Sequence, residues 1–201
     1  MENKSSKERT LVLLKPDAVQ RNLVGEIIKR FEQVGLKIVG LKLVHPTREQ
    51  AWRHYVKSDA EITALGERSI EGKKKWGVEV HDDPTELGRR IVDRLVKFLT
   101  ASPVVAIVLE GNKSVPLVRK LVGSTEPLQS DVGTVRGDFT LDSYEIADDG
   151  DRAVRNLVHA ASSVEDAAYE INVWFKPNEL LNYKHIRETV LYDVNFDTIN
   201  E

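Results

Sequence analysis

A histidine and a glutamate within residues 155–170 are the pair best suited to chemistry in this sequence. His159 follows the short apolar pair Leu157-Val158, which is expected to form a strand that delivers the imidazole at its end. Glu170 lies in the helical pattern that follows, on the second turn, from which its carboxylate could point back toward the strand. An imidazole within reach of a carboxylate suits a nucleophile or a general base. The alternative is a buried histidine satisfied by one hydrogen bond.

The helix that carries Glu170 has a recognisable start. After a turn of small residues, a capping serine is available at Ser162 or at Ser163, each with an acidic residue three positions later. Apolar residues then recur at helical spacing, which predicts an amphipathic helix: Val164, Ala167, Ala168, Ile171, Trp174 and Phe175.

Three cationic side chains belong to separate predicted elements. Lys15 follows the continuous apolar run 10–14, so a long cationic arm stands at the end of a strand that the next residue, a proline, stops. Arg119 lies in a predicted helix, and Arg136 lies in a glycine-flanked loop. Such cations suit a polyphosphate, because an arginine grips phosphate through two donors and phosphoryl transfer spreads negative charge over several oxygens. Taken singly, Lys15 and Arg119 could equally be solvated surface cations.

The hydrophobic pattern predicts the elements that position these residues. Predicted strands cover 10–14, 36–44, 104–109 and 157–158, and predicted helices cover 23–34, 47–56, 60–70, 86–99, 115–122 and 164–175. With the helical stretch before the third strand treated as an insertion, the order is βαββαβ. This order predicts an α+β ferredoxin-like sandwich, an antiparallel sheet with helices mainly on one face.

Length and composition set outer limits. A chain of 201 residues is expected to form a single domain, 1–201, that needs no metal or disulfide staple. The sequence contains no cysteine, which excludes disulfides and cysteine-based metal sites and is compatible with the cytoplasmic location that we expect. Residues 1–7 lack the apolar core of a signal peptide, and no apolar run approaches the roughly 20 residues of a membrane span.

Charge and strand composition argue against nucleic-acid binding. The formal net charge is -3, whereas a nucleic-acid surface usually shows a basic surplus. The predicted strands 10–14 and 104–109 do not alternate aromatic and basic residues, as a sheet that stacks RNA bases would. A local basic pocket for a small anion remains compatible with these features.

Several motifs, in chain order, resemble those of the nucleoside diphosphate kinase family. The matching segments are 9–19, 24–28, 123–127, 133–139 and 174–177. The family's signature around its phosphorylated histidine is met by Asn156-Leu157-Val158-His159-Ala160 and then relaxes to Ala161-Ser162-Ser163. The motifs span roughly residues 8 to 183, and several in order are far more specific than any one alone.

The resemblance implies an activity and a set of site residues. The implied reaction moves the terminal phosphate of a nucleoside triphosphate to a nucleoside diphosphate through a phosphohistidine, with Mg²⁺ carried by the nucleotide and no protein metal ligands. The implied assembly is a homo-oligomer, a hexamer or a tetramer. The implied roles are His159 as nucleophile, Glu170 as the carboxylate that holds its ring, Tyr55 as a support near the histidine, Lys15, Arg119, Thr125 and Arg136 as phosphate ligands, and Asn156 with Lys15 as ligands of the sugar hydroxyl.

The sequence departs from the family pattern in two insertions and a tail. A helical insertion at 57–97 replaces the segment that carries the base-stacking aromatic residue, for which Trp76 is a candidate unless it only anchors the loop. A second insertion at 141–152 precedes the histidine strand, and a tail covers 184–201. We expect catalysis to be retained and either the base clamp or a subunit contact to be rebuilt. The competing hypothesis is a catalytically weak nucleotide-binding or interaction module on the same fold.

Overall fold

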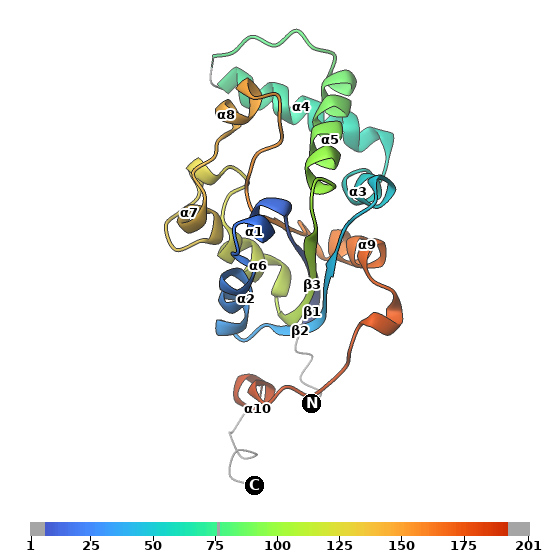
Figure 1. Cartoon of the computed structure of the whole chain (residues 1–201), viewed down its shortest axis with the longest axis vertical. Coiled ribbons are helices and arrows are strands. Elements are labelled where there is room, and N and C mark those ends of the chain that lie inside the picture. The colour runs from blue at the N-terminus through green and yellow to red at the C-terminus, as the bar shows by residue number, and fades with distance from the viewer. Residues whose placement is uncertain (1–6, 76, 193–201) are drawn as a thin grey trace.

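The computed structural model describes residues 7–75 and 77–192 (Figure 1). Trp76 and the end of the tail, 193–201, lie outside the described residues. The elements are β1 (Lys7–Leu14), α1 (Pro16–Gln20), α2 (Val24–Gln33), β2 (Lys37–Val44), α3 (Arg48–Tyr55), α4 (Asp59–Lys75), α5 (Pro84–Leu99), β3 (Val104–Asn112), α6 (Ser114–Val122), η1 (Pro127–Gln129), α7 (Val135–Phe139), α8 (Tyr144–Asp149), β4 (Val158–Ala160), α9 (Val164–Trp174), η2 (Pro177–Glu179) and α10 (Arg187–Tyr192).

The four strands form one sheet in the order β2-β3-β1-β4. Every neighbouring pair is antiparallel, so the predicted ferredoxin-like α+β architecture is confirmed. The apolar runs that end β1 and open β3 lie in the two central strands and are buried on both faces of the sheet. The strand that carries the histidine is short and lies at one edge, beside β1.

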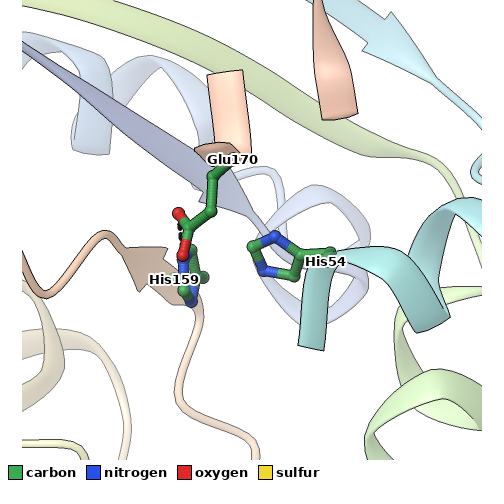
Figure 2. A group of neighbouring side chains, drawn as sticks. All are labelled: His54, His159 and Glu170. Atoms are coloured by element: carbon green, nitrogen blue, oxygen red, sulfur yellow. Dashed lines mark hydrogen bonds and ion pairs between the residues drawn. The ribbon is translucent and has the colours of Figure 1, made fainter. Parts of the chain in front are cut away.

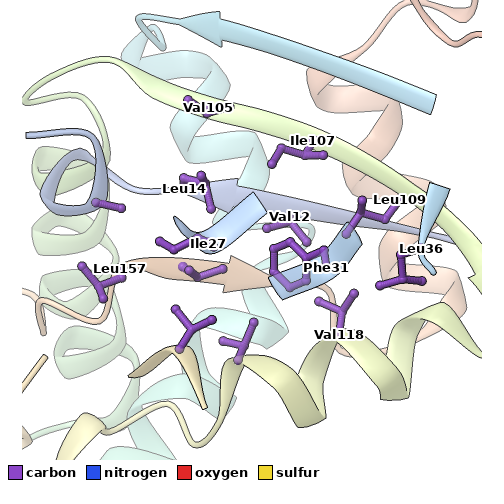
Figure 3. Close-up of a cluster of buried hydrophobic side chains, with 14 residues drawn as sticks. Val12, Leu14, Ile27, Phe31, Leu36, Val105, Ile107, Leu109, Val118 and Leu157 are labelled. Carbon is purple, nitrogen blue, oxygen red and sulfur yellow. The ribbon is translucent and has the colours of Figure 1, made fainter. Parts of the chain in front are cut away.

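Helices cover both faces of the sheet, which corrects the expectation that they lie mainly on one. Because side chains alternate along a strand, Val12 and Leu14 point to one face, and Leu11 and Leu13 point to the other. The first face packs against α2 and α6, and Figure 3 shows its cluster around Phe31. The second face packs against α3, α5 and α9. Helix α5, most of which lies in the predicted helical insertion, supplies part of this second layer, because its apolar positions contribute core residues.

The two predicted insertions contact each other. Helices α4 and α5 form a hairpin, and Figure 1 shows α8 beside α4. Asp148 on α8 pairs with Lys73 of α4 at 2.9 Å and with Arg94 of α5 at 3.3 Å. Exposed ion pairs of this kind contribute little stability, but they show that segments far apart in sequence share one surface.

The described part of the tail lies against the sheet. Glu188 of α10 bonds Lys37 of β2 at 3.0 Å and Lys7 of β1 at 2.8 Å. Lys37 also pairs with Glu110 of β3 at 2.7 Å, and its own side chain is only 6% exposed. No helix among residues 7–75 and 77–192 combines the length and apolar character needed to cross a membrane.

Candidate active site

The position of His159 follows from the register of β4. His159 pairs with Leu13 of β1, and directly opposed residues of an antiparallel pair point to the same face. Leu13 belongs to the face covered by α3 and α9, so the imidazole enters the layer that these helices form. Ser163 is the N-cap of α9, and its side chain accepts a hydrogen bond from the Asp166 backbone N–H at 3.0 Å. Of the two predicted caps, the structure therefore uses Ser163.

Glu170 holds one nitrogen of the histidine. Its Oε2 lies 2.8 Å from Nε2 of His159, as the helical spacing predicts (Figure 2). The other nitrogen, Nδ1, has no hydrogen-bond partner in the part of the chain that the structure describes. The His159 side chain is 22% exposed, whereas that of Glu170 is 6% exposed. A shielded carboxylate thus fixes one edge of a more open imidazole ring.

Burial and charge set the protonation of this pair. Burial, followed by the charges of Lys15, Arg136 and Arg119, lowers the pKa of His159 to about 3. Burial raises the pKa of Glu170 to about 7. The histidine is therefore neutral at physiological pH, and the three cations that lower its pKa lie close enough to act on it. The structure brings Lys15, Arg119 and Arg136 around His159.

Lys15 and Asn156 form one unit. Lys15 Nζ donates to Asn156 Oδ1 at 2.7 Å, and Asn156 Nδ2 donates to the Thr125 carbonyl oxygen at 2.7 Å. Both Lys15 and Asn156 are buried. Burial, followed by the charge of Arg136, lowers the pKa of Lys15 to about 7. This unit joins the end of β1 to the predicted phosphate loop and to the histidine segment.

Arg136 is tied to the backbone around the histidine. Its guanidinium donates to four carbonyl oxygens, those of Gly123, Ser124, Asn156 and Val158, at distances between 2.6 and 3.1 Å. It is 7% exposed, and burial is the main cause that lowers its pKa to about 10. The family resemblance implies that Arg136 binds phosphate, and the structure adds that its guanidinium holds two loops together.

Arg119 and Thr125 are more open. Arg119 lies on α6 with an exposed side chain and makes no ion pair with the described residues. Thr125 is exposed in the loop before η1. Both are accessible to a ligand, and their role as phosphate contacts stays a prediction. The predicted support, Tyr55, is different, because its hydroxyl is buried and has no partner among residues 7–75 and 77–192.

Two further residues were missed by the motif comparison. Asp17 accepts from the backbone N–H of Leu157 at 3.0 Å and of Ala18 at 3.1 Å. Leu157 has a left-handed φ of 64°, which non-glycine residues rarely adopt, so Asp17 helps to hold a strained turn just before the histidine. An acidic residue directly after the proline that ends β1 was the available signal.

His54 is the second missed residue. Its ring centroid lies 4.2 Å from that of His159 at an interplanar angle of 82° (Figure 2). It is 3% exposed, on the buried side of α3 with Ala51, three positions earlier. That helical spacing is visible in the sequence, but the family pattern points to the neighbouring Tyr55 and not to His54.

Comparisons with known proteins identify the family. The family described as "Nucleoside diphosphate kinase" matches residues 8–63 and 84–180, so α5 and the second insertion fall inside matched segments. A nucleoside diphosphate kinase of Pyrobaculum aerophilum is 46% identical over 179 residues, covering 87% of this chain and 98% of the relative. One of Staphylococcus epidermidis is 37% identical over 186 residues, covering 92% of this chain and 99% of the relative.

Solved structures agree with the sequence relatives. An NDP kinase crystal structure from Pyrobaculum aerophilum superposes with a TM-score of 0.83 at 44% identity, covering 88% of this chain and all of that one. A transition-state mimic of the Borrelia burgdorferi enzyme with bound vanadate and ADP superposes with a TM-score of 0.75 at 35% identity, covering 92% of this chain and 96% of that one. This chain therefore belongs to the nucleoside diphosphate kinase family, enzymes that move the terminal phosphate of a nucleoside triphosphate to a nucleoside diphosphate.

Proposed function

We propose that the transfer runs in two half-reactions through a phosphoryl group carried on Nδ1 of His159. The observation that supports this most directly is the bond between Nε2 and Glu170. An ionised carboxylate can only accept, so Nε2 carries the ring proton and Nδ1 keeps its lone pair. Nδ1 is then the nucleophilic atom, and it faces no other protein partner among the described residues.

In the first half-reaction the Nδ1 lone pair attacks the terminal phosphorus of the triphosphate. The N–P bond forms as the bond to the bridging oxygen breaks, and that oxygen leaves on the diphosphate with the electron pair. The imidazole gains positive charge at this moment, and the Glu170 carboxylate at 2.8 Å stabilises it. In the second half-reaction an oxygen of the acceptor diphosphate attacks phosphorus, and the pair returns to Nδ1.

The cations are expected to bind the phosphates. Lys15, Arg119 and Arg136 are the charges that lower the pKa of His159, which places them within electrostatic reach of any phosphoryl group bound there. The same charges stabilise the negative oxygens in the transition state. Thr125 adds a neutral donor in the exposed loop. We propose that the single free N–H of Arg136 and the exposed guanidinium of Arg119 complete this set.

We propose that the buried polar groups beside the phosphate bind the rest of the reacting nucleotide. Asn156, held by Lys15 and by the Thr125 carbonyl, is proposed to bond the sugar hydroxyl together with Lys15. The Tyr55 hydroxyl has no protein partner in the described ranges, and we propose that it forms a hydrogen bond with an oxygen of the phosphoryl group on His159. An isolated buried hydroxyl is unfavourable, so a ligand oxygen there would satisfy it.

The family generally needs a divalent metal, and we propose that it is Mg²⁺ held by the nucleotide phosphates. Most of the side chains proposed to bind phosphate are cations, and the two carboxylates near them are already engaged, Asp17 by two backbone N–H groups and Glu170 by His159. Residues 7–75 and 77–192 thus offer no oxygen cage there, which fits an ion that prefers phosphate oxygens and water. When bound, Mg²⁺ neutralises phosphate charge, while the protein residues bind, orient and transfer.

Other properties stay predictions. We expect a cytoplasmic homo-oligomer, a hexamer or a tetramer, with no membrane or specific nucleic-acid partner. We also expect the predicted insertions to alter the base end of the site, because Asp142, in the second of them, accepts a hydrogen bond from the Arg155 backbone N–H at 2.6 Å, next to Asn156 in the chain. Turnover with all four bases, as ribose and deoxyribose substrates, tests this. Values matching those of a relative without the insertions, with the same assembly, would contradict it.

Labelling with γ-labelled ATP tests the proposed function. The intact protein with Mg²⁺ should acquire an acid-labile, base-stable label that added GDP removes. His159→Gln should remain unlabelled. An unlabelled wild-type protein would overturn the phosphohistidine mechanism and favour the binding-module hypothesis. A label retained in His159→Gln would place the phosphoryl group on another residue.

A further inference from the structure

Two side chains one turn apart on α9 each bond a different histidine. Glu170 bonds His159, and Trp174 Nε1 donates to Nδ1 of His54 at 3.2 Å. Positions i and i+4 lie on one face of a helix, so α9 presents both partners to the same place. The two histidine rings pack edge to face, with their centroids 4.2 Å apart (Figure 2). A continuous row therefore runs from Glu170 through both imidazoles to Trp174.

Trp174 fixes the proton on His54. An indole N–H can only donate, so Nδ1 of His54 must accept, and the neutral ring carries its proton on Nε2. Burial, followed by the neighbouring His159, lowers the pKa of His54 well below its usual range, which keeps the ring neutral. Nε2 is buried and has no partner among residues 7–75 and 77–192. A buried donor without a partner is uncommon and calls for an explanation.

We propose that His54 is a positioning residue that holds the ring of His159, with its polar edge against the face of that ring and close to the Glu170 carboxylate. This rests on the proposed role of His159 as nucleophile. Glu170 holds the Nε2 edge of the His159 ring, and His54, packed against one face of that ring, prevents the ring from rotating. Together they direct Nδ1 toward the phosphate, and small misplacements of a reacting group can cost about 100-fold in rate.

The same contact affects the charge of Glu170. A ring nitrogen of each histidine and a Glu170 oxygen lie within 4.8 Å of one another. After burial, His54 and Lys57 lower the pKa of Glu170, and Asp166 raises it. His159 bonds the carboxylate directly, and Tyr55, the remaining group nearby, is kept neutral by burial. Because the His54 ring is neutral, it can act on the carboxylate only through the dipole of its Nε2–H, and loss of that dipole should raise the pKa of Glu170.

A transition-metal site is the other use of this trio, and the Trp174 bond argues against it. A metal ligated by Nε2 of His54 would require the proton to move to Nδ1, where it would oppose the indole N–H. It would also have to separate Glu170 from His159. The structure thus favours a donor at Nε2 over a ligand.

His54→Phe tests the proposal, because it retains a ring and removes both nitrogens. The rate of phosphoenzyme formation in a single turnover should fall about 10- to 100-fold, while the nucleotide Kd stays within about twofold. The acid limb of the pH–rate profile, where protonation of Glu170 slows phosphoenzyme formation, should move to higher pH. His81→Phe is the matched control, since His81 is 89% exposed, and it should leave rate and limb unchanged.

A second variant covers the case in which His54→Phe does not fold. Trp174→Phe keeps His54 but removes the indole N–H that fixes its tautomer. The rate of phosphoenzyme formation and the pH of the acid limb in this variant should fall between those of wild type and His54→Phe. A wild-type rate and limb in either folded variant would overturn the proposal, as would inhibition by Zn²⁺ that depends on His54. Failure of the proposed function is separate, because the wild-type protein itself would then acquire no label.

Discussion

Replacement of Glu170 by glutamine probes the tautomer on which the chemistry depends. The ionised carboxylate obliges Nε2 of His159 to carry the proton, whereas a protonated acid can donate to Nε2 and shift the ring proton to Nδ1. Because burial raises the pKa of Glu170 to about 7, phosphorylation should weaken as pH falls through about 7. A glutamine amide offers both a donor and an acceptor, so it no longer selects the active tautomer at any pH.

The size of the effect follows from the bond that is lost. A hydrogen bond to a charged group contributes about 1.5–3 kcal/mol, and each 1.36 kcal/mol is about tenfold in rate. Glu170→Gln should therefore slow phosphoenzyme formation about 10- to 150-fold above neutral pH and remove the acid limb. Rapid-quench labelling across about two pH units on either side of neutrality measures both.

A matched control and a clear contrary result accompany this test. Glu165→Gln changes an exposed glutamate on the first turn of the same helix and should preserve both rate and pH profile. A Glu170→Gln protein that labels within about twofold of wild type, with the acid limb still present, would refute the reasoning about the tautomer.

Three further variants test residues around the site. Arg136→Lys cannot replace four carbonyl contacts and should lower the free energy of unfolding by about 1–3 kcal/mol in urea denaturation, with a slower transfer; an unchanged midpoint would contradict the tethering role. Lys15→Met should abolish transfer. It should also remove a rise in stability between about pH 7 and 10.5, because the unfolded chain binds more protons there than the folded one. Asp17→Ala removes the acceptor of the Leu157 backbone N–H and should lower the free energy of unfolding by about 2 kcal/mol. A loss below about 0.5 kcal/mol would show that other groups hold the turn.

Much of the fold could be predicted because periodicity is a local property. The central strands appeared as continuous apolar runs, and helix α5 appeared through apolar residues on one side. The side of the sheet that each helix covers could not be predicted in this way. It depends on which of Leu13 or Leu14 faces which layer, and that is set by strand order and register.

The site was predicted where motif residues act directly and missed where residues act through others. His159 and Glu170 lie within one segment, so their pairing could be anticipated from helical spacing. His54 reaches the same ring from α3, far earlier in the chain, and only the packing of α3 against α9 brings it there. The backbone role of Arg136 was equally hidden, because its partners are carbonyl oxygens, which every residue possesses.

Nδ1 of His159 is expected to carry the phosphoryl group while Nε2 bonds Glu170. Phosphorus–nitrogen coupling in the nuclear magnetic resonance spectrum of the ¹⁵N-labelled phosphoenzyme identifies the phosphorylated atom directly. A phosphorus coupled directly to Nδ1 of His159, with the proton on Nε2, is the predicted result. A phosphoryl group on Nε2, or on any other residue, would contradict the account.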